Sequence, residues 1–257
     1  MAREYVNSPI EEAICEFRYS PETEWDLAVP GLFYSRIQEE LPEREQRRVR
    51  SVELVMGPEG LLEELVVQDR MFFFSTDRSV GVQLGPKFLG VNVLKPYPSW
   101  QRFRPRIEYA FRTLNDTVEM KGIYGINLRY INLIQIPGKD VNPEEYFSFL
   151  PRLGSGFPES ADSFMAGAEL PFSDGRDACR IEVSDGIPSM PDSTAYLLNI
   201  EYFLSEPESI QQDMVTEWLD NAHSKAVELF EACITDKARE LFGVKQEAEA
   251  VKGEGTV

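Results

Sequence analysis

The chain has 257 residues, of which 42% are hydrophobic and 27% are charged, proportions that are ordinary for a globular protein. This composition excludes wholesale disorder, a collagen-like repeat and a disulfide scaffold. The 44 acidic and 26 basic residues give a net charge of −18. Because nucleic-acid binders need basic surfaces to neutralise phosphates, this charge argues against a nucleic-acid partner and favours a basic protein partner.

The ends of the chain and its cysteines point to a cytoplasmic protein. The N-terminal segment carries charges where a signal peptide needs an apolar core, and no apolar run reaches the roughly 20 residues that span a bilayer. Cys15, Cys179 and Cys233 show no CxxC spacing, so we interpret them as small buried residues and not as metal ligands. Residues 244–257 are small, charged and glycine-containing, which predicts a disordered acidic tail.

The first half of the chain alternates between strand and helix patterns. Helical spacing of apolar residues predicts a helix within residues 25–41 that begins near Pro30, and a second helix that Ser99 caps and that runs to Leu114. The basic run 43–50 is typical of a solvated loop. Short apolar runs between turn signals predict strands over residues 10–19, 52–56, 61–68, 70–76, 80–84 and 88–94.

The second half repeats this order. Asn142 and Pro143 predict a helix start that leads into residues 146–150, and residues 154–163 form a predicted loop. A long amphipathic helix is predicted over residues 206–242, with a break and a new cap at Thr235. Further strands are predicted over residues 126–136, 164–172, 176–184 and 194–204.

The shared order suggests an internal duplication. Residues 16–19 parallel residues 127–130, and the helix that begins at Trp100 parallels the one that contains Trp218. We therefore predict an α+β fold of two halves, residues 1–121 and 122–243, whose strands form a mainly antiparallel sheet or saddle with the long helices on one face. The TATA-binding protein offers an analogy for this fold but not for its function, and the helix-grip arrangement is the alternative.

Several blocks of the sequence resemble one protein family. They are SPIEEAICEFR at residues 8–18, LGVNVLKPYPSW at 89–100, INLRYINLIQIP at 126–137 and AHSKAVELFEACITDKARELFG at 222–243. Together they are similar to a sporadically distributed, uncharacterised bacterial family of proteins of about this length, and PYPSW and RYIN are the most specific blocks. The resemblance implies a bacterial cytoplasmic protein with an accessory or defence-associated role, and it carries over no catalytic residue.

The sequence offers no catalytic constellation. His223 is the only histidine and has no serine or cysteine signature around it, so we interpret it as a surface or half-buried helical residue. Neither a GxxxxGK[ST] nor a GxGxxG phosphate loop occurs. We therefore expect no catalytic residue, no metal site and no cofactor.

Polar side chains that alternate with the apolar ones on strands are the best candidates for binding. If they share one sheet face, their arginines would suit a carboxylate-bearing ligand or an acidic segment of a partner. The alternatives are an internal ion pair between Glu16 and Arg129, and a core role for the aromatic candidates. The candidate binding residues are Arg18, Asn92, Lys95, Tyr97, Trp100, Asn127 and Arg129.

Three functions remain open from the sequence. The first is a non-enzymatic interaction or regulatory module, such as an antitoxin-like inhibitor, an immunity factor or an accessory subunit, that binds a protein partner through its acidic surface. The second is a small-molecule-binding domain with a pocket between the sheet and the C-terminal helix, near Lys95 and Arg129 and lined by Phe72, Phe74 and Tyr130. The third is a hydrolase that depends on a divalent metal.

Overall fold

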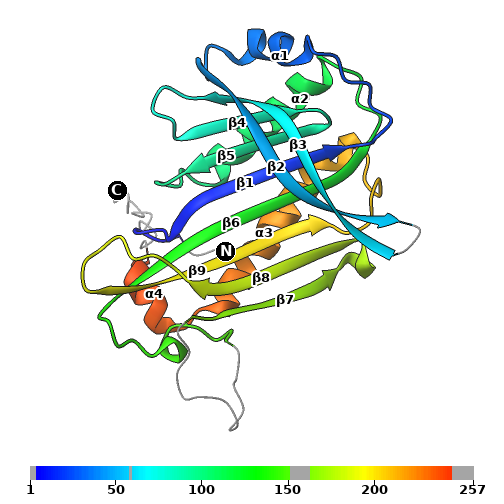
Figure 1. Ribbon diagram of the computed structural model, residues 1–257. Coiled ribbons are helices and arrows are strands. Elements are labelled where there is room, and N and C mark those ends of the chain that lie inside the picture. Colours follow the sequence, from blue (N-terminus) through cyan, green and yellow to red (C-terminus); the bar gives the residue numbers. More distant parts are fainter. Residues whose placement is uncertain (1–3, 58–59, 151–162, 245–257) are drawn as a thin grey trace, which may run out of the picture.

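The computed structural model describes residues 4–57, 60–150 and 163–244, and the side chains of all of these except 50–57 and 60–66. Its strands form one antiparallel sheet in the order β2-β3-β4-β5-β1-β6-β9-β8-β7 (Figure 1). The predicted α+β class with a mainly antiparallel sheet is therefore confirmed. The strands are β1 (Ile10–Tyr19), β2 (Glu43–Gly57), β3 (Gly60–Phe74), β4 (Val80–Gly85), β5 (Phe88–Leu94), β6 (Ile123–Pro137), β7 (Met165–Phe172), β8 (Asp177–Asp185) and β9 (Ser193–Leu204).

The two central strands owe their place to a mostly alternating pattern of side chains. In β1, Ala13, Cys15 and Phe17 are fully buried, whereas Glu16 and Arg18 between and after them reach solvent. The neighbouring β6 alternates in the same way from residue 126 to residue 136, where every second side chain is buried. Such period-two patterning assigns one face of the sheet to the core and leaves the other polar.

The helices cover the apolar face. They are α1 (Val29–Ile37), α2 (Trp100–Asn115), α3 (Val215–Cys233) and α4 (Asp236–Phe242). Figure 1 shows α2 and α3 behind the sheet, and in the sequence their buried residues recur at helical spacing. The opposite face of the central strands, which includes Glu16, Arg18, Asn127 and Arg129, is called the open face below.

The predicted break before α4 is confirmed. The hydroxyl of Thr235 accepts a hydrogen bond from the backbone nitrogen of Ala238 at 3.4 Å, which is the N-cap that the sequence predicts. The helix predicted within residues 25–41 is confirmed as α1, whose first turn contains Pro30. All three cysteines are buried and unpaired, as predicted.

The basic run at residues 43–50 was predicted to be a loop, and this prediction is wrong. These residues begin β2, which pairs with β3 along its whole length and forms a long hairpin. Their charges are compensated across the strands, because Arg48 lies 3.3 Å from Asp69 and Arg78 lies 2.7 Å from Glu45. The guanidinium of Arg47 also stacks over the ring of Phe72, so these side chains make cross-strand contacts while they stay exposed to solvent.

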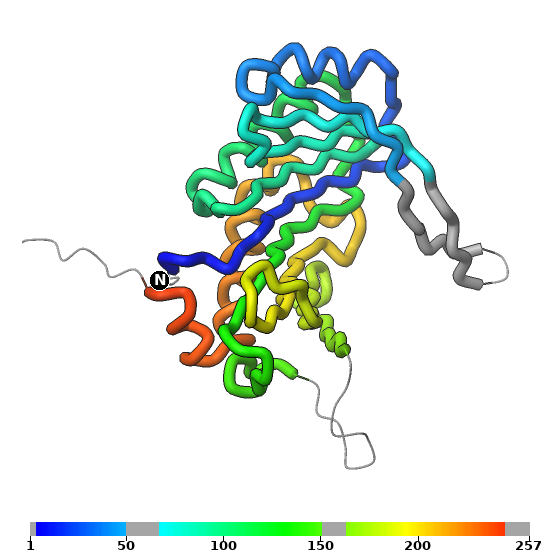
Figure 2. The backbone as a smooth tube through the Cα atoms, turned by 60° about the vertical axis from the view of Figure 1, so that its left-hand side comes forward, coloured from blue at the N-terminus to red at the C-terminus, as the bar shows by residue number. Residues whose placement is uncertain are grey.

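The outer part of this hairpin is a two-stranded arm. Only residues 71–74 of β3 pair with β4, so residues 60–70 are paired with β2 alone. In Figure 1 the arm passes in front of the sheet, on the side away from α2 and α3, and in Figure 2 the coloured start of β2 and the coloured end of β3 already turn out of the sheet. The strands predicted separately at 61–68 and 70–76 are therefore one continuous strand.

The helix predicted after Asn142 is also shorter than expected. Residues Pro143–Glu145 form one 3-10 turn, with the Asn142 side chain accepting a hydrogen bond from Glu144 at 3.1 Å, and no helix follows over 146–150. The predicted loop at 154–163 and the predicted tail lie almost wholly outside the described residues. Among the described residues, no helix is long and apolar enough to cross a membrane.

Both halves of the chain contribute to one sheet, which the paired strands β1 and β6 join at its centre. The predicted boundary at residues 121 and 122 falls between α2 and β6. The first half supplies five strands and the second half four among the described residues. The duplication itself stays a prediction.

Candidate functional site

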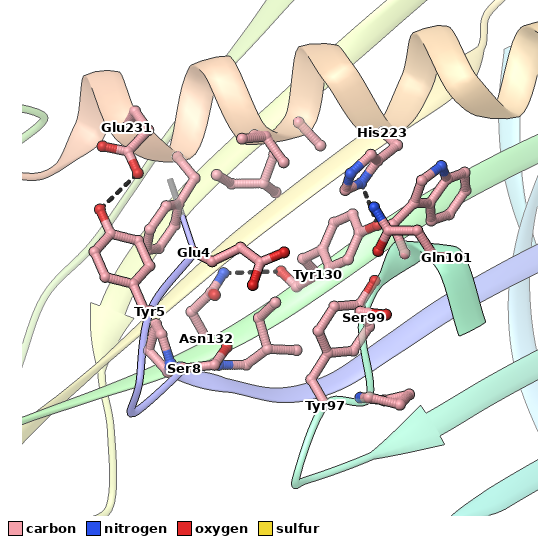
Figure 3. A pocket seen from close by; sticks show the side chains of 18 residues that line it. Glu4, Tyr5, Ser8, Tyr97, Ser99, Gln101, Tyr130, Asn132, His223 and Glu231 are labelled. Atoms are coloured by element: carbon pink, nitrogen blue, oxygen red, sulfur yellow. Dashed lines mark hydrogen bonds between the residues drawn. The ribbon is translucent and has the colours of Figure 1, made fainter. Parts of the chain in front are cut away.

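A cavity of about 410 Å³ lies between the sheet and α3 (Figure 3). This is the region where the second function considered from the sequence, small-molecule binding, places a pocket. Four parts of the chain enclose it: the N-terminal segment, the loop that leads into α2, the central strands and α3. Its volume is in the range of known small-molecule sites. The lining residues are Glu4, Tyr5, Ser8, Pro9, Ile10, Tyr97, Pro98, Ser99, Trp100, Gln101, Tyr130, Asn132, Ile200, His223, Ala226, Val227, Phe230 and Glu231.

The N-terminal segment closes one end of the cavity. The backbone nitrogens of Val6 and Asn7 donate hydrogen bonds to the carbonyls of Gly243 (2.8 Å) and Phe242 (2.9 Å) at the end of α4. The hydroxyl of Tyr5 donates to Glu231 Oε1 at 2.6 Å. Segments from the two ends of the described chain thus hold this wall together.

His223 is the centre of the opposite wall. Its imidazole stacks on the indole of Trp100, with ring centroids 4.4 Å apart and planes 10° from parallel. Its Nδ1 shares a hydrogen bond of 2.8 Å with the Tyr130 hydroxyl. Burial lowers the pKa of His223 to about 4, against a smaller opposing effect of Asp220, so the imidazole is neutral at pH 7.

Tyr97 adds an unsatisfied polar group beside this pair. Its ring packs edge-on against that of Tyr130 at 5.9 Å. Its hydroxyl is buried and approaches that of Tyr130 but makes no well-formed hydrogen bond within the described residues. Burial raises the pKa values of both hydroxyls, so both keep their protons. A buried hydroxyl without a partner is costly, and such groups call for an explanation.

Ser99 joins the cavity wall in a strained backbone conformation. Its φ of 136° and ψ of 165° lie in a region that is nearly confined to glycine. The sequence correctly places this residue at the N-cap of α2, but its side chain makes no capping hydrogen bond, contrary to our expectation. Strain of this kind persists where the surrounding structure over-determines it, and it is common at binding sites.

A second polar cluster lies beneath α3, and its residues do not line this cavity. Asp177 is fully buried and accepts hydrogen bonds from Trp218 Nε1 (3.0 Å), the Tyr202 hydroxyl (3.1 Å) and Arg176 (2.7 Å). Asn221 in turn donates to the Tyr202 hydroxyl at 3.2 Å. Burial by itself would raise the pKa of Asp177, but the bonds from Arg176 and Trp218 outweigh it and the pKa is lowered. We call these residues the Asp177 cluster.

Of the seven predicted binding residues, the structure brings Tyr97 and Trp100 to the cavity. Trp100 also donates through Nε1 to Asp220 at 2.9 Å, which ties the start of α2 to α3. Lys95 is exposed and pairs with Glu11 at 2.5 Å. Arg18, Asn92, Asn127 and Arg129 lie on the other side of the sheet.

The open face holds its own polar network. Asn127 Nδ2 donates to Glu16 and Glu201, both at 3.0 Å, and Arg180 lies 3.6 Å from Glu201. The ion pair considered between Glu16 and Arg129 is not formed; Arg129 instead acts at longer range on Glu201. Burial raises the pKa of Glu201, and the charges of Arg129 and Arg180 oppose this.

The small-molecule function predicted three aromatic residues in the pocket lining, and one of the three lines the cavity. Tyr130 lines the cavity, as predicted. Phe72 and Phe74 do not; their rings stack with each other, 6.2 Å apart, and lie under Arg47 near the base of the hairpin arm.

Sequence reasoning missed His223 and Ser99 as site residues. Trp100, Tyr130 and His223 come from three elements far apart in the chain, so no local spacing signals their contact. The one usable signal was that His223 is the only histidine and follows the apolar stripe of an amphipathic helix. No family model matches the chain, and no curated protein matches it significantly.

Proposed function

We propose that this protein binds a small organic molecule in the cavity between β6, β9 and α3. The observation that carries the proposal is the cavity itself, with the buried hydroxyl of Tyr97, which has no well-formed hydrogen bond, beside the neutral pair Tyr130 and His223. A few polar groups placed in a mostly apolar hollow are what small-molecule sites typically offer. A ligand that hydrogen-bonds to Tyr97 would offset the cost of burying this poorly bonded hydroxyl.

The single histidine makes this proposal testable by NMR. A fragment library is screened against protein carrying labelled histidine, and we expect hits that shift the His223 resonances and raise the melting temperature. Native mass spectrometry of gently purified protein tests for a retained ligand. If no compound moves the His223 signal, small-molecule binding is refuted.

Two phenylalanine substitutions on the same helix separate cavity binding from surface binding. Ala226→Phe fills the cavity from a buried position, whereas Ala232→Phe adds the same ring at an exposed one. We expect the first to abolish fragment binding and the second to leave it unchanged, with folding checked by circular dichroism. Val227→Phe serves as a second cavity-filling variant.

A second proposal concerns the open face. We infer that it binds a protein partner with a basic surface, which the net charge of −18 and the lack of a helix over this face support. Charge reversal by Glu182→Lys, on the open-face side of β8, is expected to weaken binding of a purified partner, and Glu22→Lys is the control at a remote exposed site. Equal binding by both variants would contradict it. We also propose that the protein is cytoplasmic, which its three unpaired cysteines fit.

A further inference from the structure

One ring nitrogen of His223 is left for a ligand. The imidazole lines the cavity and points from α3 toward β6 (Figure 3). Its Nδ1 is engaged by the Tyr130 hydroxyl at 2.8 Å, whereas Nε2 has no hydrogen-bond partner among the described residues. Whether Nε2 donates or accepts decides what the ligand must carry. The inference rests on the proposed small-molecule function and makes it more specific.

The hydroxyls of Tyr130 and Tyr97 determine which nitrogen of the imidazole carries the proton. Both hydroxyls keep their protons, and the Tyr130 oxygen is the side-chain acceptor that the buried Tyr97 hydroxyl approaches. If Nδ1 carried the proton, it would donate to Tyr130, Tyr130 would donate to Tyr97, and the Tyr97 proton would be buried without an acceptor.

A proton on Nε2 avoids this cost. Tyr130 then donates to Nδ1, and Tyr97 directs its proton at the Tyr130 oxygen, although the geometry of this contact is poor. Because no proton of the pair is then left without an acceptor nearby, the Nε2–H form is the more stable one. His223 therefore presents a hydrogen-bond donor to the cavity.

Two other donors of the lining are already used within the chain. Trp100 Nε1 donates to Asp220 at 2.9 Å. The side-chain amide of Asn132 donates to the carbonyl of Leu198 at 3.0 Å. These bonds hold the walls in place, which leaves the imidazole N–H to orient a ligand.

The cavity offers no charge that is free to pair with a charged ligand. Among the described residues that line it there is no lysine or arginine. Glu231 pairs with Arg239 at 2.9 Å and accepts a hydrogen bond from Tyr5 at 2.6 Å, and the exposed Glu4 also has an interaction partner within the chain. An ion in the cavity would lose hydration without gaining an opposite charge, which is costly, so an uncharged ligand is favoured.

We propose that the cavity takes an uncharged, mainly apolar organic molecule whose hydrogen-bond acceptor, such as a carbonyl oxygen, receives the Nε2–H of His223. The apolar part of the ligand packs on Ile10, Ile200, Val227 and Phe230, which also line the cavity. A donor that gains an acceptor in an apolar surrounding adds both affinity and orientation. No covalent step and no proton transfer are involved.

Four planar probes of nearly equal size test the acceptor and the charge separately. Acetophenone is neutral and carries a carbonyl, and α-methylstyrene has a methylene group in place of this oxygen. Benzoate is an anion and benzamidine is a cation at pH 7. Each probe is titrated against the full chain, with the His223 resonances and the melting temperature as readouts.

The expected order of affinity has acetophenone first. We expect it to bind about three- to tenfold more tightly than α-methylstyrene, which corresponds to one hydrogen bond. Both charged probes are expected to bind at least about tenfold more weakly than acetophenone, because each loses hydration without a partner. Equal or tighter binding of α-methylstyrene, benzoate or benzamidine would overturn the assignment.

NMR of the free protein tests the donor itself. The chain has a single histidine, so long-range proton–nitrogen correlations report which of its ring nitrogens carries the proton. We expect the proton on Nε2, and we expect the Nε2 signal to move more than that of Nδ1 when acetophenone binds. A proton on Nδ1 in the free protein would contradict the proposal.

Variants of His223 locate the bound acceptor. His223→Phe keeps a ring against Trp100 but has no N–H, so acetophenone should lose its advantage over α-methylstyrene in calorimetric titrations. His223→Gln places an amide N–H near the position of Nε2 and should retain part of this advantage. The control is Ser224→Ala at the exposed neighbouring residue, which should change neither affinity. If the full advantage survives in His223→Phe, the acceptor binds elsewhere and the proposal is wrong.

The outcomes also separate the two proposals. If fragments bind in the cavity but the neutral acceptor is not preferred, or if none of the four probes binds, the ligand class is refuted and the small-molecule function stands. If no probe and no fragment of any charge moves the His223 signal, both fall together.

Discussion

Two polar clusters lie under α3, and they differ in how completely their buried polar groups are hydrogen-bonded. We call a fully bonded cluster an anchor, because it stabilises the packing of the helix, and we call an incompletely bonded cluster beside a cavity a candidate site. In the Asp177 cluster the carboxylate receives four hydrogen bonds from three side chains, and Asp177 does not line the cavity. In the cluster of His223, Tyr130 and Tyr97, one buried hydroxyl lacks a well-formed bond and a cavity of about 410 Å³ lies alongside. A saturated polar cluster stabilises the packing of the helix, whereas an unsaturated one beside a cavity is poised to bind something.

The largest effect is expected at Asp177. The variant Asp177→Ala leaves buried donors on Trp218 and Tyr202 without an acceptor, so we expect a loss of about 3 kcal/mol or more in the free energy of unfolding. Urea denaturation measures this loss. Since the pKa of Asp177 is lowered, its contribution is complete above the unfolded value of about 3.9 and is lost as pH falls through the folded value. A loss below about 1 kcal/mol would show that the cluster is no anchor.

The lowered pKa of His223 predicts that the free energy of unfolding depends on pH. Its pKa is about 4 in the folded protein against 6.5 for an unperturbed histidine, so between these values the unfolded chain holds a proton that the folded chain does not. The free energy of unfolding therefore rises with pH across this window, by about 3 kcal/mol in total. Carboxylates titrate near its lower end, so the measured quantity is the difference between the wild type and His223→Phe.

The control for this prediction is the histidine resonance itself. NMR titration of the single histidine reports its folded pKa directly. The variant keeps a ring against Trp100 but has no group that titrates, so its stability should lack the rise. A folded pKa near 6.5 would show that water reaches the imidazole and that the stack is open.

Ser99 tests whether the wall of the cavity is strained. Glycine adopts φ of 136° without steric cost, so Ser99→Gly is expected to stabilise the protein by about 1 kcal/mol. The matched control is Ser35→Gly in the exposed part of α1, where glycine should destabilise by about 0.5–1 kcal/mol. Thermal denaturation of both variants compares them, and destabilisation by Ser99→Gly would argue against strain.

The contrast between the clusters also explains what the sequence could predict. Strand and helix periods are local, so β1, β5 and the break before α4 were predictable within a residue or two. The basic run in β2 was not, because its charges are compensated by partners on another strand and across a turn, such as Asp69 and Arg78. Residue spacing does not reveal such pairing.

The candidate site also has a part that local sequence predicts and a part that depends on the tertiary arrangement. Tyr97 and Trp100 could be singled out because they stand together in one distinctive block. The contact of Trp100 with His223, and the side of the sheet on which the arginines lie, depend on how α2 and α3 cross the sheet. The expectation of an arginine-lined pocket failed for that reason: Arg129 and Tyr130 are neighbours in sequence and point to opposite faces of one strand.

The smallest effect on stability carries the sharpest distinction between anchor and site. Tyr97→Phe removes a buried hydroxyl that has no well-formed bond, so we expect a change within about 1 kcal/mol and toward greater stability. Tyr130→Phe removes a hydroxyl that is bonded to His223, so we expect a loss of about 1 kcal/mol. The two changes delete the same atom from adjoining rings, and urea denaturation compares them directly.

Fragment affinity should fall severalfold in Tyr97→Phe even as stability holds, because a group that costs stability in the empty protein is kept for what it binds. If Tyr97→Phe destabilises as much as Tyr130→Phe and leaves fragment affinity unchanged, then Tyr97 belongs to the packing and does not bind the ligand.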